Sequence, residues 1–279
     1  MQRSDDLAGL TILVTGAGGG IGHEVVRELA KRGAAVVAGV RDPVHGAALA
    51  AELGPNAEYF AADVASPPSL TAAVRRLAQT HARLDVLINN AGVVTAKRTL
   101  ASDGHEMTWA TNVLGPYRLV RALAPLLRAA PAPRIVNVGS SAQNMGSIVW
   151  DDVEYRRRRF RSFPAYAASK LALMTLTRAL AAREPGIAVS CVHPGALGTG
   201  IWRGAPAPIA ALLRRFLPPA HRGAGPIIAL ATAADRAGVR GAYFARFEEK
   251  TPPKFALDDA NVARLWELLG ATDAVAATA

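Results

Sequence analysis

Short apolar runs alternate along this chain with longer stretches in which apolar residues recur at helical spacing. Several runs are almost uninterrupted, Val86-Leu87-Ile88 among them, as is typical of parallel strands buried on both faces. The alternation predicts an α/β fold, a doubly wound parallel sheet of about seven strands with helices on both faces. We predict strands at residues 11–15, 35–40, 58–62, 84–89, 134–138, 188–193 and 241–244, and helices at 21–32, 43–53, 68–82, 106–129, 166–183, 225–234 and 258–269.

Two segments depart from this alternation. Residues 145–164 separate a predicted strand from its helix and contain aromatic and basic side chains, and residues 198–219 are rich in proline and glycine. Ligands of open α/β sheets bind beyond the carboxyl ends of the strands, where both segments emerge, so we expect them to form substrate loops. No repeat or change in composition marks a second unit, and residues 1–279 are expected to form one domain.

The composition narrows the class of protein. With 51% hydrophobic and 19% charged residues, the chain can bury a large core. It has no run of about 20 uncharged apolar residues and no secretory signal pattern, so no membrane partner is expected. The single cysteine, Cys191, excludes an intrachain disulfide and favours a reducing, cytoplasmic setting. No group of cysteine, histidine or acidic residues has metal-ligand spacing, and no metal is expected.

The net charge of +10 raises the question of an anionic partner. Most of the arginines are scattered, and the one dense group is Arg156-Arg157-Arg158-Arg159 with Arg161. Three explanations compete for this group. Solvated surface charge is favoured over recognition of a carboxylate, phosphate or acidic carrier protein, and nucleic-acid contact ranks last. No nucleic-acid-binding motif accompanies the charge, so no nucleic-acid partner is expected.

A glycine-rich segment follows the first predicted strand and opens the first predicted helix. A strand that turns through glycines into a helix leaves backbone N–H groups unpaired at the positive end of the helix dipole. Such a turn can hold a phosphate or pyrophosphate, although glycines also serve tight turns and close helix–strand contact. The segment consists of Thr15, Gly16, Ala17, Gly18, Gly19, Gly20, Ile21 and Gly22.

Three further motifs accompany the glycine turn: Asn89-Asn90-Ala91-Gly92, Tyr166-xxx-Lys170 and Pro194-Gly195. Together the four motifs resemble the short-chain dehydrogenase/reductase family, and the resemblance extends from about residue 10 to residue 270. It implies a Rossmann fold that binds a nicotinamide dinucleotide. Within the family the chain is most similar to the retinol-dehydrogenase-like group, through Val40-Arg41-Asp42, the long segment between Ser140 and Tyr166, Val192-His193-Pro194-Gly195, Gly241-Ala242-Tyr243-Phe244 and Leu265-Trp266-Glu267.

The resemblance also implies a set of cofactor contacts. Asp63 would touch the adenine with Val64 beside it, and Asp63 could equally be an acid favoured by the helix dipole. Asn89 would steady the sheet, and Ala91 and Gly92 would let the backbone approach the ribose. The nicotinamide would contact Pro194, Gly195, Leu197 and Thr199, with Tyr166 and Lys170 also against the cofactor.

Arg41 bears on the choice between NADP and NAD. A guanidinium can pair with a 2′-phosphate, whereas a carboxylate at the end of this strand would accept hydrogen bonds from the ribose 2′-hydroxyl. Arg41 therefore favours NADP, with NAD the less favoured cofactor, and Asp42 is expected to cap the following helix, which starts at Pro43. No basic residue lies within residues 17–19, where many NADP-preferring relatives carry a second one.

Tyr166 and Lys170 lie four residues apart in a predicted helix, so their side chains share one face. A nearby ammonium favours phenolate and is expected to lower the tyrosine pKa, which lets Tyr166 act as general acid or base. The resemblance places the hydrogen-bonding catalytic serine at Ser140, with Ser141 as the fallback. Asn112 would hold a water in a proton relay to Lys170, or would be a polar group satisfied in the core. His193 is expected to be structural.

These residues predict an oxidoreductase that transfers a hydride between nicotinamide and a ketone, an aldehyde or a secondary alcohol. The alternatives are a catalytically silent NADPH-binding regulator on the same fold and a nucleic-acid binder. The expected partner is a small-molecule carbonyl or alcohol substrate. The resemblance allows a homodimer or homotetramer, because relatives often pair through the helices equivalent to 106–129 and 166–183.

Overall fold

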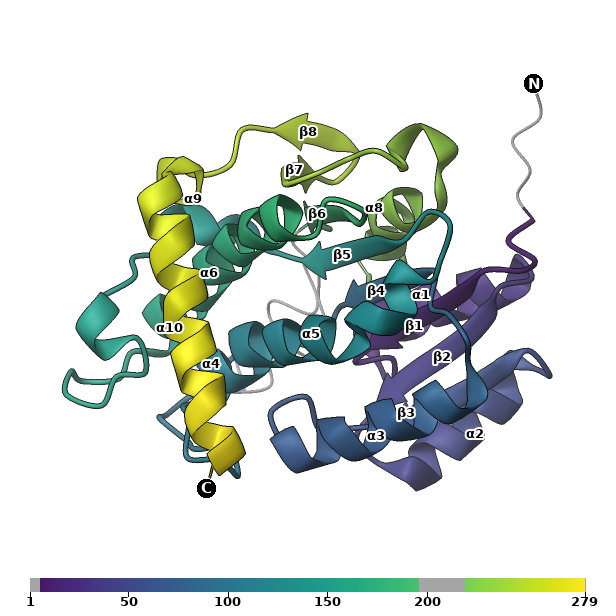
Figure 1. Ribbon diagram of the computed structural model, residues 1–279, viewed down its shortest axis with the longest axis horizontal. Helices are drawn as coiled ribbons and strands as arrows, with labels where there is room; N and C mark the ends of the chain where they lie inside the picture. Colours follow the sequence, from purple (N-terminus) through teal and green to yellow (C-terminus); the bar gives the residue numbers. More distant parts are fainter. Residues whose placement is uncertain (1–5, 196–218, 279) are drawn as a thin grey trace.

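The computed structural model of the chain describes residues 6–195 and 219–278. Its described strands form one sheet of eight, in the order β3-β2-β1-β4-β5-β6-β7-β8. The first seven strands run parallel, and β8 pairs antiparallel with β7 (Figure 1). The strands are β1 (Thr11–Thr15), β2 (Ala35–Val40), β3 (Ala57–Ala61), β4 (Val86–Asn89), β5 (Arg134–Val138), β6 (Ala188–His193), β7 (Ala242–Ala245) and β8 (Glu248–Lys250).

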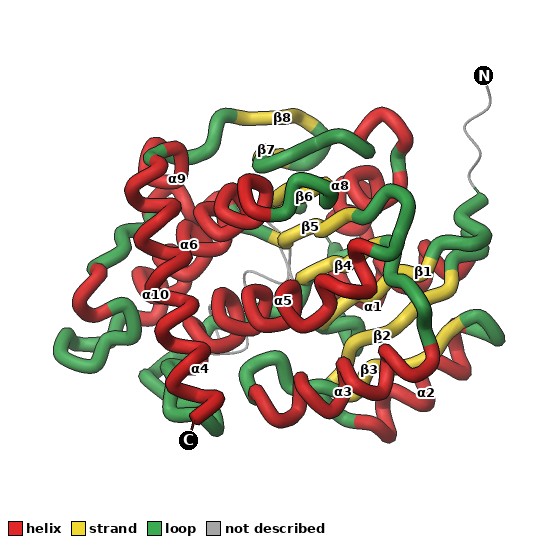
Figure 2. The backbone as a smooth tube through the Cα atoms, in the orientation of Figure 1, coloured by secondary structure: helices red, strands yellow, loops and turns green. Residues whose placement is uncertain are grey.

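Helices cover both faces of this sheet (Figure 2). One face packs against α1, α2 and α8 and the other against α3, α5 and α6, with a buried hydrophobic cluster on each side. The predicted doubly wound fold is therefore confirmed. The described helices are α1 (Gly20–Lys31), α2 (Pro43–Leu53), α3 (Pro67–Thr80), α4 (Met107–Trp109), α5 (Gly115–Arg128), α6 (Ser162–Arg183), α8 (His221–Thr232), α9 (Lys254–Leu257) and α10 (Asp259–Thr278).

The structure differs from the predicted elements at several places. The single helix predicted at 106–129 is divided into α4, a π-helical segment at Ala110–Leu114 and α5. α6 begins four residues before the predicted start, and α10 ends nine residues after the predicted end. β8 was not predicted, because Glu248, Glu249 and Lys250 are all charged and exposed and provide no apolar signal.

Helix α10 packs across the outer sides of α5 and α6 (Figure 1). The Trp266 ring meets the ring of Tyr117 edge-on, with centroids 5.3 Å apart, and the Arg183 guanidinium lies 4.6 Å from the Trp266 ring centre. The buried Arg118 links Asp103, at 2.7 Å, to Asp273 of α10, at 3.1 Å. These contacts join three helices that lie far apart in the sequence.

In the part of the chain that the structure describes, no helix combines the length and apolar character needed to cross a membrane.

Candidate active site

The glycine turn between β1 and α1 has the backbone form that a phosphate-binding turn requires. Gly16 and Gly20 have φ of +68° and +57°, in the left-handed region where side chains are disfavoured. A Cβ at Gly22 would overlap the carbonyl oxygen of Gly16, and a Cβ at Gly16 would lie 2.9 Å from the Ala91 Cα. Glycine is therefore required at these positions by close backbone approach as well as by conformation.

Thr15 and Asn90 hold this turn in place. The Thr15 hydroxyl accepts hydrogen bonds from the backbone N–H groups of Asn90 and Ala91, both at 3.0 Å. The Asn90 amide donates to the carbonyl oxygens of Thr15, at 2.8 Å, and Gly16, at 3.3 Å. Sequence analysis did not assign a role to Asn90, although its position beside Asn89 after an apolar strand was a usable signal.

The start of α1 fits the pyrophosphate of a dinucleotide. Gly19 is the N-cap of α1 and makes no side-chain capping bond, so the first N–H groups of the helix keep their donor capacity. Apart from the two chain neighbours of Gly19, no atom of the described residues lies within 4 Å of the position that a Gly19 Cβ would take. The open space, the free donors and the positive end of the helix dipole suit an anion at this point.

The end of β2 adjoins the same turn. Arg41 is exposed there, and Asp42 caps α2 as predicted, because its carboxylate accepts from the Val44 N–H at 2.9 Å. His45 is an exposed side chain on α2, and the sequence analysis gave it no role at the glycine turn. Its Nε2 lies 3.2 Å from the Gly18 carbonyl oxygen, which places the imidazole beside the glycine turn.

Asp63 and Val64, which follow β3, form a tight local turn. The Asp63 carboxylate accepts a hydrogen bond from the Ala65 N–H at 3.0 Å, and the backbone N–H of Asp63 donates one to the Ser69 hydroxyl at 3.0 Å. A Cβ at Gly115 would lie 2.9 Å from the Val64 carbonyl oxygen, so Val64 packs closely on the start of α5. These contacts fix the loop at the carboxyl edge of the sheet.

Asn89 is buried and belongs to a chain of amide hydrogen bonds that crosses the sheet. Its Nδ2 donates to the Asn137 oxygen at 2.8 Å, and the Asn137 Nδ2 donates to the Thr177 hydroxyl at 2.9 Å. This series of hydrogen bonds links β4, β5 and α6. The steadying role inferred for Asn89 has a direct physical basis in these bonds.

Ser140 and Tyr166 lie together at the carboxyl end of β5. Tyr166 is 7% exposed, and its ring packs with Ala142 and Ala167. Burial raises the pKa of the Tyr166 phenol, and a hydrogen bond with the Ser140 side chain opposes that rise. Ser141 is exposed, so it is Ser140 whose hydroxyl approaches the tyrosine.

Lys170 is buried one helical turn after Tyr166. Its Nζ donates to the Val138 carbonyl oxygen at 2.8 Å and lies 5.8 Å from the centre of the Tyr166 ring. Burial lowers the pKa of Lys170 from 10.5 to about 8. The expected lowering of the Tyr166 pKa by this ammonium is not found, because desolvation outweighs the other influences on the phenol.

Asn112 lies within the π-helical segment and is fully buried. Its oxygen accepts from the Val93 N–H at 2.9 Å, and its Nδ2 donates to the Val93 carbonyl at 3.0 Å and to the Ser169 hydroxyl at 2.9 Å. These three bonds are all to protein groups, and the water relay to Lys170 stays a prediction. It ties the segment after Gly92 to α6, next to Lys170.

Gly139 lies directly before Ser140, and the structure shows why this position has no side chain. A Cβ at this position would lie 2.6 Å from the Sγ of Cys191 on the neighbouring strand. Cys191 is fully buried, and burial raises the pKa of its thiol to about 12. The thiol occupies the space that a side chain at residue 139 would need.

The segment after β6 turns at Gly195, which has a φ of +107°. Burial lowers the pKa of His193, with smaller effects from Arg246 and Lys170 in the same direction, so the neutral imidazole is favoured. The Arg246 N–H donates to the His193 carbonyl oxygen at 2.8 Å, and Pro194 is buried. Two predicted cofactor contacts, Leu197 and Thr199, lie outside the described residues, as does the loop at 198–219 except for Pro219.

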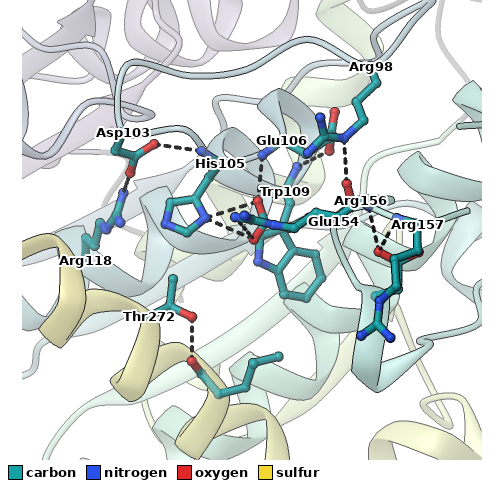
Figure 3. A network of polar contacts seen from close by, with 12 residues as sticks. Arg98, Asp103, His105, Glu106, Trp109, Arg118, Glu154, Arg156, Arg157 and Thr272 are labelled. Atoms are coloured by element: carbon teal, nitrogen blue, oxygen red, sulfur yellow. Dashed lines mark hydrogen bonds and ion pairs between the residues drawn. The ribbon is translucent and has the colours of Figure 1, made fainter.

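The loop at 145–164 is anchored by a charged network (Figure 3). The Glu154 carboxylate accepts from the Glu106 N–H at 2.7 Å and meets Nδ1 of His105 at 3.0 Å, while Arg98 donates to the Glu154 carbonyl oxygen at 3.0 Å. Burial alone would raise the pKa of Glu154, but the bonds from His105 and Glu106 outweigh it and the pKa lies below its usual value.

The arginine group of this loop divides into two sets. Arg156 pairs with Glu154 at 3.3 Å, Arg158 pairs with Asp152 at 3.1 Å, and Arg157 donates to the Asp151 carbonyl oxygen at 2.8 Å. These three stabilise the loop itself. Two exposed arginines remain for solvent or a ligand, Arg159 and Arg161.

Comparison with known proteins agrees with this geometry. Residues 10–208 match the short chain dehydrogenase family. The chain is 31% identical over 277 residues to retinol dehydrogenase 13 of Homo sapiens, which covers 93% of this chain and 83% of that protein. Among solved structures, the RhlG/NADP active-site complex of Pseudomonas aeruginosa has a TM-score of 0.68 and 28% identity, covering 88% of this chain and 97% of that one.

A second solved structure is 3-ketoacyl-(acyl-carrier-protein) reductase from Brucella melitensis complexed with NADH. Its TM-score is 0.67 at 25% identity, over 86% of this chain and 97% of that one. The chain belongs to the short-chain dehydrogenase/reductase family, near the retinol-dehydrogenase-like group, as its motifs predicted. It is an oxidoreductase of the class that binds NAD(P) and acts on small molecules.

Proposed function

We propose that this protein is an NADP(H)-dependent oxidoreductase that interconverts a ketone or aldehyde with the corresponding alcohol. The observation that carries the proposal is the meeting of Ser140, Tyr166 and Lys170 at the carboxyl end of β5. The glycine turn beside them suits a dinucleotide. Proton-transfer groups at the ligand edge of a doubly wound sheet are what carbonyl reduction requires.

Each residue has a proposed role. A bound nicotinamide supplies or accepts the hydride. Tyr166 donates a proton to the substrate oxygen in reduction and takes it back in oxidation, while Ser140 donates a hydrogen bond to that oxygen. Lys170 stabilises the phenolate, and its lowered pKa leaves it able to exchange a proton near neutral pH. Asn112 positions the helix that carries both residues through its bond to Ser169.

NADP is the proposed cofactor over NAD. Arg41 is exposed at the end of β2 and is suited to a 2′-phosphate, and His45 adds an imidazole beside Gly18 in the place where a second basic group was missing from the sequence. One similar structure is a complex with NADP and another a complex with NADH, so the proposed preference depends on these two side chains.

The substrate class follows from the chemistry and from the names of relatives. Retinol dehydrogenase and 3-ketoacyl reductase both denote reactions at an alcohol or carbonyl carbon. A silent NADPH-binding regulator is the weaker candidate, because such a protein has no need of the buried lysine and the serine that accompany Tyr166.

The test is Tyr166→Phe, assayed by NADPH absorbance over a panel of ketones and aldehydes and repeated with NADH. Loss of the phenol should reduce kcat by about 10²–10⁴-fold, the usual contribution of a general acid. The dissociation constant for NADPH should change by less than about threefold, since this substitution removes one hydroxyl from the site. Tyr59→Phe on β3 is the matched control and should keep full activity. Turnover by Tyr166→Phe near the wild-type rate would refute the assignment.

A further inference from the structure

Gln143 lies in the turn that joins β5 to α6, three residues after Ser140. The turn is a short 3₁₀ segment, Ser141–Met145. Its backbone is well bonded, since the Gln143 N–H donates to the Ser140 carbonyl at 3.0 Å and the Gln143 carbonyl accepts from the Gly146 N–H at 3.1 Å. The Gln143 side chain is nevertheless buried, with 1% of the residue exposed.

Neither polar atom of this side chain, Oε1 or Nε2, has a hydrogen-bond partner among the described residues. A buried amide without partners is unfavourable for folding, and a methionine of similar volume would avoid that cost. Sequence analysis gave Gln143 no role, and no hydrogen bond within the described part of the chain accounts for an amide here. An unfavourable polar group beside a reactive site is typical of a residue retained for ligand binding.

The position of the side chain points to the ligand. Gln143 Oε1 lies 3.5 Å from the position that a Cβ of Gly139 would take, and that same position is in contact with Cys191 of β6. The amide therefore lies at the carboxyl ends of β5 and β6, the edge at which doubly wound sheets bind their ligands.

The turn is also held rigidly against the helix that carries Tyr166. Ala142 packs with Tyr166 and Ala167, and a Cβ at Gly146 would lie 2.5 Å from the Ala167 carbonyl oxygen. Ala142, directly before Gln143, and Gly146, three residues after it, therefore both pack on α6 and hold the turn against that helix. The Gln143 side chain lies on this anchored turn, so a ligand group that reaches it would bind without a large ordering cost.

We propose that Gln143 binds a neutral hydrogen-bonding substituent of the substrate, a hydroxyl or second carbonyl close to the reacting carbon. This inference rests on the proposed carbonyl reduction. An amide offers one donor group and one acceptor, which together match a hydroxyl. The preferred substrates are then hydroxyketones and dicarbonyl compounds, because a plain ketone leaves the buried amide unpaired.

The experiment compares 2-hydroxyacetophenone with propiophenone, which differ only by a hydroxyl in place of a methyl group. Wild-type enzyme should prefer the hydroxyketone by about tenfold or more in kcat/KM, the value of one well-made hydrogen bond. Gln143→Met should bring the ratio near one, because the hydroxyl of the hydroxyketone then finds no partner. Asn144→Met, an exposed amide in the same turn, is the matched control and should keep the wild-type ratio.

Stability and binding provide readouts that do not need turnover. Gln143→Met should raise the Tm of the ligand-free protein by a few degrees, because it removes an unpaired buried amide. With NADPH present, 2-hydroxyacetophenone should raise the Tm of wild type more than that of Gln143→Met. If neither ketone is reduced but this difference in Tm persists, the reaction is wrong and the binding site stands. A lower Tm for Gln143→Met, or an unchanged preference, would overturn the inference and leave carbonyl reduction unaffected.

Discussion

The contact between Gly139 and Cys191 supports a quantitative prediction about stability. Gly139→Ala places a methyl group 2.6 Å from the Cys191 Sγ, a full ångström or so inside normal contact, between two paired strands of the central sheet. Overpacking of this kind costs about 1–3 kcal/mol. An alanine at a glycine position without a positive φ also gains about 0.4–1 kcal/mol by restricting the unfolded chain. The net expectation is a loss of about 1–2 kcal/mol in the free energy of unfolding.

Removing the Cys191 thiol should reverse the sign of the change that Gly139→Ala causes in the free energy of unfolding. In a Cys191→Ala background the same Gly139→Ala change meets no sulfur, so only the gain of about 0.4–1 kcal/mol remains. The coupling energy between the two positions is then about 2 kcal/mol, measured by urea denaturation of the four proteins at one temperature. Gly186→Ala, where no atom lies within 4 Å of the new methyl group, controls for the backbone effect. Equal destabilisation by Gly139→Ala in both backgrounds would refute the steric argument.

Two further predictions concern charge. Arg41→Ala should raise the KM for NADPH at least tenfold and change the KM for NADH by less than threefold, because the 2′-phosphate of NADPH loses its guanidinium partner. Both constants are measured from initial rates, and equal changes in the two would show that Arg41 does not select the cofactor. The second prediction concerns Lys170, whose pKa is 10.5 in the unfolded chain and about 8 in the folded chain. Between these two values the unfolded state binds more protons than the folded state, so the free energy of unfolding rises with pH. The stability of wild type relative to Lys170→Met should therefore increase from pH 8 to 10.5, by up to about 3 kcal/mol, and a flat difference in paired denaturation curves would contradict the lowered pKa.

The elements that could be predicted from the sequence are those bounded by local signals. α2 matched its predicted range because Asp42 caps it, Pro43 occupies its first position and Gly54 follows its end with a φ of +100°. β1, β2, β5 and β6 also matched, since apolar runs between polar residues define buried parallel strands. The π-helical segment around Asn112 gave no such signal, because a change of hydrogen-bond register depends on what packs against the helix.

The candidate site divides in the same way. Tyr166, Lys170 and the glycines were identifiable because the spacing of their motifs has a direct chemical meaning. Asn90 and His45 act through contacts with residues 27 or more positions away, and Gln143 stands out by the absence of a partner. Neither feature can be seen in a linear pattern. The requirement for glycine at residue 139 gave no local signal either, because it depends on Cys191 of another strand.

Helix α10 limits how the two helices beneath it can meet a partner. It lies against Tyr117 of α5 and Arg183 of α6, so the chain itself covers these parts of the two helices. A second subunit that docked directly on them would first have to displace α10 and break the ion pair between Arg118 and Asp273.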